Sequence, residues 1–163
     1  MAEKQVIVVG YDESDHSQYA LEWTLQHFFT NQASKPLYKL IVVHAKATPI
    51  SVLSHAGPGL NYGSASSEMF SRVEGDLKKQ TEYIIQKAKE ICKANEVEDV
   101  EVIVSEGDPR NVICETVEKY KASFLIVGSH GYGVLKRAVL GSVSDHCSHY
   151  AKCSVTVVRD PKA

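Results

Sequence analysis

Five short apolar runs alternate along the chain with segments of helical periodicity, and this alternation constrains the fold more than any other feature. The apolar runs, rich in β-branched residues, occupy residues 5–10, 37–45, 100–104, 123–128 and 154–158. Helices are expected over residues 18–29, residues 67–95, a stretch that begins at Pro109, and residues 142–151. Continuous apolar runs are typical of strands buried on both faces, which occur in parallel sheets. The pattern therefore predicts an α/β fold, an open five-stranded parallel sheet with helices on both faces.

Composition excludes several other classes of protein. The chain has 163 residues, of which 44% are hydrophobic and 23% charged, which is ordinary for one globular domain and unlike a disordered chain or a coiled coil. The formal net charge of −2 provides no general attraction to nucleic acid or to an anionic membrane. No run approaches the roughly 18 apolar residues of a membrane helix, and the first residues carry no signal-peptide pattern. We therefore expect a single cytoplasmic domain over residues 1–163, with the nucleus as a second location and with no membrane or nucleic-acid partner.

Residues 46–66 differ in composition from the rest of the chain. Prolines, glycines and serines follow one another closely there, without the apolar periodicity of the neighbouring segments. The segment predicts a mobile loop of about twenty residues, and a loop of that length inside a compact domain is usually functional or disordered.

The carboxyl ends of the parallel strands are expected to hold the functional site. Ligands bind at this edge of an open α/β sheet, where the strand order reverses. Right-handed crossovers leave two common orders, 3-2-1-4-5 and 2-1-3-4-5. In the first order the reversal lies between strands one and four. The loop after strand one then brings Gly10, Tyr11 and Asp12 to the same crevice as the GSHGYG loop of residues 128–133.

The loop after the fourth strand has a glycine spacing suited to a phosphate. It reads Gly-x-x-Gly, nine residues, then Gly-Ser over residues 128–142, and it contains Lys136 and Arg137. Glycine allows a backbone to approach a phosphate closely, because no Cβ intervenes. If Ser142 caps the next helix, the amides behind it face an anion at the positive end of that helix. On the residues alone a second interpretation stays equally open, in which the glycines only form turns and Ser142 is only a cap.

The histidine and cysteine patterns do not predict a metal site. His44 lies inside an apolar strand and is expected to be a buried histidine with a satisfied hydrogen bond. His146 and His149 share a helix face, but no acidic or thiol partner completes a site. The four cysteines lack paired spacing and are expected to be reduced core residues, with oxidation of Cys147 and Cys153 as the alternative.

Four stretches of the sequence carry a family resemblance. They are VVGYDESDHSQYALEW, LIVVHA, EGDPRNVICE and GSHGYGVLKRAVLGSVSDHCSHYAKCSVTVV, and together they cover nearly the whole chain. In this order they resemble the universal stress protein family, particularly its small single-domain plant members, and the last is similar to the nucleotide-binding signature of the ATP-binding subgroup. The resemblance implies a Rossmann-like fold of the adenine nucleotide alpha hydrolase type with strand order 3-2-1-4-5. The last strand, Ser154 to Val158, is then an apolar edge, and we expect it to join a homodimer as in many members of the family.

The resemblance also implies a nucleotide ligand, ATP or AMP, with Mg²⁺ or Mn²⁺ accompanying ATP. Asp12 would contact the ribose hydroxyls or the phosphate region, and the backbone of Ala45 would meet the adenine edge. The family often has Arg at the position of His130, and a neutral imidazole offers less charge to a phosphate. The nucleotide-binding residues implied in this way are Tyr11, Asp12, Ala45, Val127, Gly128, Ser129, His130, Gly131, Gly133, Gly141, Ser142, Val143 and Ser144.

These features predict a nucleotide-binding module of stress response or signalling with little or no hydrolysis. A phosphate cradle is present, but no set of residues that would hold a metal and position a nucleophile is recognisable, so no catalytic residue is assigned. The first alternative is a slow ATPase, to which Asp12, Lys136 and Arg137 would contribute. The second alternative is a chaperone-like or interaction protein that does not depend on nucleotide, based on the 46–66 loop and the long charged helix.

Overall fold

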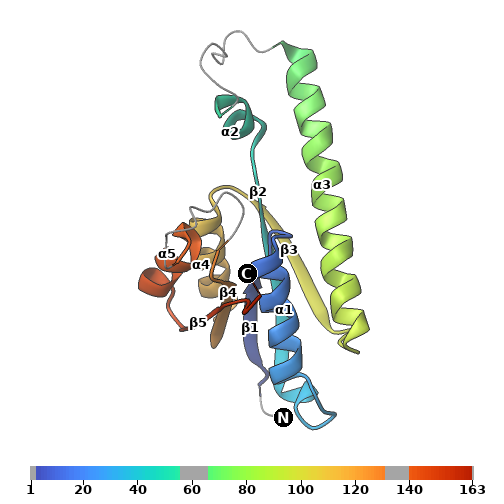
Figure 1. Ribbon diagram of the computed structural model, residues 1–163, viewed down its shortest axis with the longest axis vertical. Coiled ribbons are helices and arrows are strands. Elements are labelled where there is room, and N and C mark those ends of the chain that lie inside the picture. The colour runs from blue at the N-terminus through green and yellow to red at the C-terminus, as the bar shows by residue number, and fades with distance from the viewer. Residues whose placement is uncertain (1–2, 56–65, 131–139, 163) are drawn as a thin grey trace.

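β1, formed by Gln5–Gly10, lies at the centre of a five-stranded parallel sheet. The computed structural model describes residues 3–55, 66–130 and 140–162. The other strands are β2 (Tyr38–Lys46), β3 (Val100–Glu106), β4 (Phe124–Gly128) and β5 (Ser154–Val158). The helices are α1 (Asp15–Phe28), the 3₁₀ turn η1 (Lys35–Leu37), α2 (Pro49–Ser54), α3 (Ser67–Ala94), α4 (Pro109–Lys119) and α5 (Ser142–Tyr150). The strands follow the order β3-β2-β1-β4-β5 (Figure 1), so the predicted fold class and strand order are confirmed.

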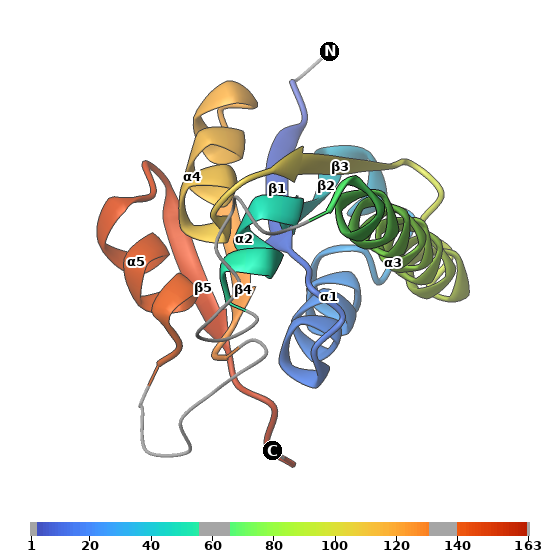
Figure 2. The ribbon, with the colours of Figure 1, turned by 90° about the horizontal axis from the view of Figure 1, so that it is seen from above.

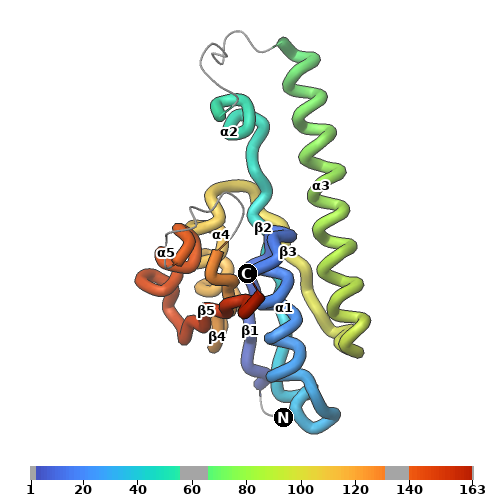
Figure 3. The backbone as a smooth tube through the Cα atoms, viewed as in Figure 1, coloured from blue at the N-terminus to red at the C-terminus, as the bar shows by residue number. Residues whose placement is uncertain are grey.

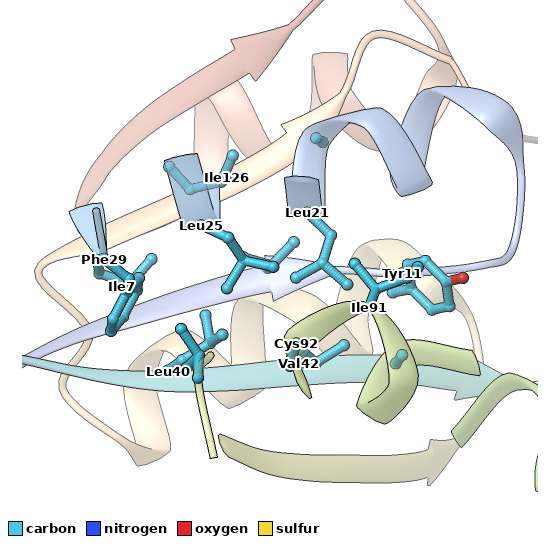
Figure 4. Close-up of a cluster of buried hydrophobic side chains, with 14 of the residues drawn as sticks. Ile7, Tyr11, Leu21, Leu25, Phe29, Leu40, Val42, Ile91, Cys92 and Ile126 are labelled. Atoms are coloured by element: carbon cyan, nitrogen blue, oxygen red, sulfur yellow. The ribbon is translucent and has the colours of Figure 1, made fainter. Parts of the chain in front are cut away.

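Alternate residues of β1 pack into two cores, one on each face of the sheet. Ile7 and Val9 belong to the core beneath α1 and α3, whereas Val8 belongs to the core beneath α4 and α5. Figure 2 shows these two pairs of helices on opposite faces, and Figure 4 shows side chains of the first core, with Leu21 and Leu25 of α1 among them. The division arises because successive side chains of a strand point to opposite faces. Two-sided burial explains why the strands are apolar throughout.

Capping side chains set the start of α1 and of α4. The cap of α1 is Ser14, whose Oγ accepts a hydrogen bond from the Ser17 N–H at 3.2 Å. Asp108 caps α4 by accepting from the Arg110 N–H at 2.9 Å, and Pro109 occupies the first turn. The predicted start of this helix at Pro109 is confirmed, and a proline at this position loses no helical hydrogen bond.

The predicted loop over residues 46–66 is wrong in its first half. β2 continues to Lys46, and Pro49–Ser54 form α2. Thr48 and Ser51 make a reciprocal capping box, in which each side-chain oxygen accepts the other residue's backbone N–H, at 3.0 and 3.1 Å. These bonds satisfy two N–H groups that a helix start leaves unpaired, which stabilises a short helix despite the proline and serine content. Residues 56–65 lie outside the described part of the chain.

α3 is longer than the sheet that it covers. Its buried residues are confined to the part that begins at Leu77, and the turns before it lie beyond the carboxyl ends of the strands, on the same side as α2 (Figures 1 and 3). Within the described residues, no helix has both the length and the apolar character needed to cross a bilayer.

Candidate functional site

A pocket opens at the carboxyl ends of β1 and β4, where the order of the strands reverses. It holds about 600 Å³ of space, part of which is open solvent. The predicted residues that line it are Tyr11, Asp12, Ala45, Val127, Gly128, His130, Gly141, Val143 and Ser144. Residues far apart in the sequence therefore meet where the topology predicts a ligand.

Two hydrogen bonds hold the backbone that follows β1 at the edge of the pocket. The Tyr11 N–H donates to the Val43 carbonyl at 2.9 Å, and Nδ1 of His44 donates to the Tyr11 carbonyl at 3.0 Å. Tyr11 is 3% exposed and His44 is 9% exposed. His44 is thus the satisfied buried histidine that the sequence predicts, and it holds the backbone that carries Asp12.

Asp12 organises the first turn of α1 through one of its carboxylate oxygens. Oδ1 accepts hydrogen bonds from the Ser14 backbone N–H at 3.0 Å and from the Ser14 hydroxyl at 2.5 Å, while the Asp12 N–H donates to Ser17 Oγ at 3.1 Å. Ser14 rather than Asp12 is therefore the cap of α1, and Asp12 positions that cap. Oδ2 has no hydrogen-bond partner within the described part of the chain, so one carboxylate oxygen is available to a ligand.

The N-terminus of α5 reaches the same pocket. Its N-cap is Gly141, so the expected capping role of Ser142 is wrong: Gly141 already has the extended backbone of a cap (φ −71°, ψ 162°) and Ser142 is the first helical residue. The first intrahelical hydrogen bond runs from the Asp145 N–H to the Gly141 carbonyl at 3.0 Å. The N–H groups of Ser142, Val143 and Ser144 precede this bond and have no acceptor among the described residues. Unpaired N–H groups at a helix start favour a bound anion.

Ser129 supports the pocket from behind. The residue is 2% exposed, its N–H donates to the Val158 carbonyl at 2.9 Å, and its carbonyl accepts from the Gly141 N–H at 2.7 Å. The Ser144 hydroxyl donates to the carbonyls of Ser129 and Gly141, at 3.0 and 3.1 Å, so its proton is used within the fold. Together these bonds tie the end of β4 to β5 and to the start of α5.

Two of the described residues that were predicted for the site, Ser129 and Ser142, are not among those that line the pocket. Ser129 is buried behind the pocket, and Ser142 is exposed. Gly131 and Gly133 lie outside the described residues, as do Lys136 and Arg137.

Gly10 lines the pocket, as its place in the loop after the first strand predicts. Several other pocket residues were missed by sequence reasoning, namely Ser17, Val43, Pro109 and Ile113. A signal existed for the two residues of α4, because the turn between β3 and α4 also lies at the carboxyl edge of the sheet. His16 was missed as well, although its Nδ1 lies 3.4 Å from Ser129 Oγ. No local pattern links these two residues, which are 113 positions apart.

The described lining of the pocket carries little formal charge. Asp12 is its carboxylate, and His130 is the one described lining side chain that can become a cation. Arg110 lies near the pocket but is paired with Asp108, with 2.6 Å between Nη2 and Oδ2. Hydrogen bonds from that guanidinium hold the pKa of the Asp108 carboxyl below its ordinary value. Among the described residues, the groups that could meet a ligand anion are therefore backbone amides and His130.

The cysteines contribute to packing. Cys147 of α5 has no exposed surface, and burial raises the pKa of its thiol to about 12. Burial also raises the pKa of Cys92 to about 12, and all four cysteines are free. Thiols with a raised pKa stay protonated at neutral pH and behave as small apolar groups. Among the residues that the structure describes, no group of three His, Cys, Asp or Glu side chains is arranged to hold a metal.

Comparisons with known proteins agree with the fold. The sequence profile of the universal stress protein family matches residues 4–159. A universal stress protein A-like protein of Arabidopsis thaliana is 28% identical over 145 residues, which are 86% of this chain and 76% of the relative. Universal stress protein UspA from Lactobacillus plantarum superposes with a TM-score of 0.74 at 15% identity, covering 98% of this chain and all of that one. A universal stress protein family protein from Arabidopsis thaliana, solved with AMP bound, superposes with a TM-score of 0.65 at 22% identity, covering 97% and 94% of the two chains.

Among the four glycines whose surroundings the structure describes, Gly128 leaves the least room for a side chain. A Cβ there would lie 2.7 Å from the backbone carbon of His16 and 2.8 Å from its carbonyl oxygen. We expect Gly128→Ala to lower the free energy of unfolding by about 1–3 kcal/mol, because α1 must move away from β4. Urea unfolding followed by circular dichroism measures this change.

Gly75→Ala is the matched control, because a Cβ at Gly75 in α3 meets nothing within 4 Å. This variant should gain roughly 0.5–1 kcal/mol from helix propensity. Equal stability of the Gly128→Ala variant and the wild type would contradict the close contact between α1 and β4.

Proposed function

The chain belongs to the universal stress protein family, and we propose that it binds an adenine nucleotide, ATP or AMP, in the pocket between β1 and β4. One observation carries the proposal: the unpaired N–H groups at the start of α5 open onto the same pocket as Asp12. A phosphorylated sugar needs N–H donors for its phosphate and a hydrogen-bond acceptor for its hydroxyls. The start of α5 and the Asp12 carboxylate offer these two groups. The relative solved with AMP bound supports the choice of an adenine nucleotide.

Each part of a nucleotide has a counterpart in the pocket. The base would lie against the apolar residues Val43, Ala45 and Val127, with the Ala45 backbone at its edge. Asp12 would accept hydrogen bonds from the ribose hydroxyls through Oδ2. The phosphates would meet the amides at the start of α5, where the helix dipole is positive. Mg²⁺ or Mn²⁺ would arrive with ATP, because the described residues offer no preformed cluster of metal ligands.

The proposed activity is binding with little or no hydrolysis. Phosphoryl transfer needs charge neutralisation and a positioned nucleophile. The described lining has one carboxylate, and its Oδ1 is already occupied by Ser14. We therefore favour a module of stress response or signalling, in which bound nucleotide alters the contacts made by the protein, over an ATPase.

A homodimer through β5 is part of the proposal. Within the described chain, no strand pairs with the outer edge of β5. The strand is apolar between Ser154 and Val158, and such an edge favours pairing with a second copy. The carbonyl of Val158 bonds toward β4, so the main-chain groups of the preceding residue, Val157, face the open edge.

We expect the protein to sediment at about twice its chain mass of 18.0 kDa at micromolar concentration. Val157→Pro removes an N–H from the open edge and should shift the population toward monomer, whereas Val157→Ile keeps that N–H and should remain dimeric. Analytical ultracentrifugation measures the populations. A wild-type protein that is monomeric at tens of micromolar would overturn this part of the proposal.

Two substitutions at Ser142 test whether the amides of α5 hold a phosphate. Ser142→Pro removes one backbone N–H without breaking the helix, because proline is accepted at the first helical position and Gly141 already has the extended backbone that precedes proline. We expect the dissociation constant for ATP or AMP, measured by isothermal titration calorimetry, to rise about tenfold. Ser142→Ala keeps the N–H and should bind like the wild type.

The control pair separates the backbone from the side chain. If Ser142→Pro binds as tightly as Ser142→Ala, the phosphate does not lie at α5. If the wild type shows no saturable binding up to millimolar nucleotide, the proposed function is wrong. Mass spectrometry of small molecules released from freshly purified protein then identifies which nucleotide, if any, the protein carries.

A further inference from the structure

The Ser129 hydroxyl lies between two imidazole rings at the edge of the pocket. Its Oγ is 3.1 Å from Nδ1 of His130 and 3.4 Å from Nδ1 of His16, and the centroids of the two rings are 5.2 Å apart. His16 comes from the first turn of α1, whereas Ser129 and His130 follow β4. The close approach of α1 over Gly128 brings the two histidines together.

Hydrogen counting assigns different roles to the two rings. A serine hydroxyl has one proton to donate and two lone pairs that accept. If Nδ1 of His130 donates to Ser129 Oγ, the Ser129 proton needs an acceptor, and Nδ1 of a neutral His16 is at the right place. In this arrangement Nδ1 of His130 donates to Ser129 Oγ, as it also would from a protonated ring. The contact with Ser129 is therefore compatible with an imidazolium at His130.

His130 is also the ring on the ligand side. It lines the pocket with Gly141, Val143 and Ser144, whereas His16 does not line it. Among the described lining residues there is no Lys or Arg, and Asp12 adds a negative charge. Of the described side chains that line the pocket, His130 is the one that can become positive beside a phosphate at the start of α5.

Other charged or titratable side chains lie on the elements that border the pocket, and they are the same in the wild type and in a His130 variant. They belong to the segment before and within α1, to α4, to α5 and to the residues after β5: Asp12, Glu13, Asp15, Asp108, Arg110, Asp145, His146, Arg159 and Asp160. A bound phosphate adds negative charge on the pocket side and so favours the protonated ring over the neutral one. Histidine side chains ordinarily titrate near pH 6.5, so this effect falls in the physiological range.

We propose that His130 takes up a proton when a nucleotide phosphate binds, and that Ser129 and His16 position the ring for this role. The inference rests on the proposed function, and it makes affinity for phosphorylated nucleotides depend on pH. The affinity for a phosphorylated nucleotide should rise as the pH falls from about 8 to about 6, the range in which histidine side chains ordinarily titrate. At about pH 8 and above, this gain in affinity should be absent. Adenosine, which has no phosphate, should bind without a linked proton.

The decisive measurement compares AMP binding to the wild type and to His130→Gln between pH 5.5 and 8.5. The phosphate of AMP titrates in the same range, and the ratio of the two dissociation constants removes that contribution because both proteins meet the same ligand. We expect the dissociation constant of the variant, divided by that of the wild type, to rise about fivefold from pH 8 to pH 6. Calorimetry in buffers of different ionisation enthalpy should show uptake of about 0.3–0.8 proton per AMP near pH 7 by the wild type and less by the variant.

Two further variants test the assigned roles. His16→Phe keeps a ring but removes the acceptor for Ser129, so the gain in AMP affinity from pH 8 to pH 6 should be smaller than in the wild type. His27→Gln, at the far end of α1 from the pocket, is the matched control and should behave as the wild type. Thermal unfolding of each variant checks that the fold is retained.

The outcomes separate this inference from the proposed function. The inference is wrong if AMP binds without proton uptake and the ratio of the two dissociation constants does not change with pH. The proposal of nucleotide binding would then still stand. A pH dependence that survives in His130→Gln would overturn the assignment to His130. Absence of nucleotide binding at every pH would overturn both.

Discussion

The backbone of Ser129 makes the hydrogen bonds on which the rest of the pocket depends. Its N–H is bonded to the last residue of β5, and its carbonyl accepts from the residue that caps α5. The preceding residue, Gly128, allows the first turn of α1 to touch β4. Two consecutive residues therefore place three elements around one opening. The shape of the site is set by main-chain contacts, so it depends more on a few glycines than on the identity of the side chains around it.

The elements that the sequence predicted best are those whose signals are local and redundant. The strands are continuous apolar runs, and the start of α4 combines a capping aspartate with a proline. The failures have the opposite character. A composition average over residues 46–66 concealed the capping pair of Thr48 and Ser51. At α5 the general preference of caps for serine favoured Ser142 over Gly141, whose extended backbone provides the cap without a side-chain bond.

The pocket shows how a chain of net charge −2 can be suited to a polyanion. Its attraction for negative charge comes from oriented N–H groups at a helix start, which contribute to the local field and not to the formal charge. The buried contact between His44 and the Tyr11 carbonyl serves the same site from the other side, because it holds the backbone before Asp12. Neither contribution is visible in a count of charged residues, and the strand order is needed to see that they face one another.

The length of α3 gives the molecule two regions of different local stability. A helix of 28 residues extends about 42 Å, and no residue from 67 to 76 is buried. These first turns contact α2 but have no sheet beneath them, whereas the later turns cover the core from Leu77 onward. Helix propensity alone supports short isolated helices poorly in water. Amide hydrogens of the first turns should therefore exchange with solvent through local fraying, and those of the later turns only through opening of the core.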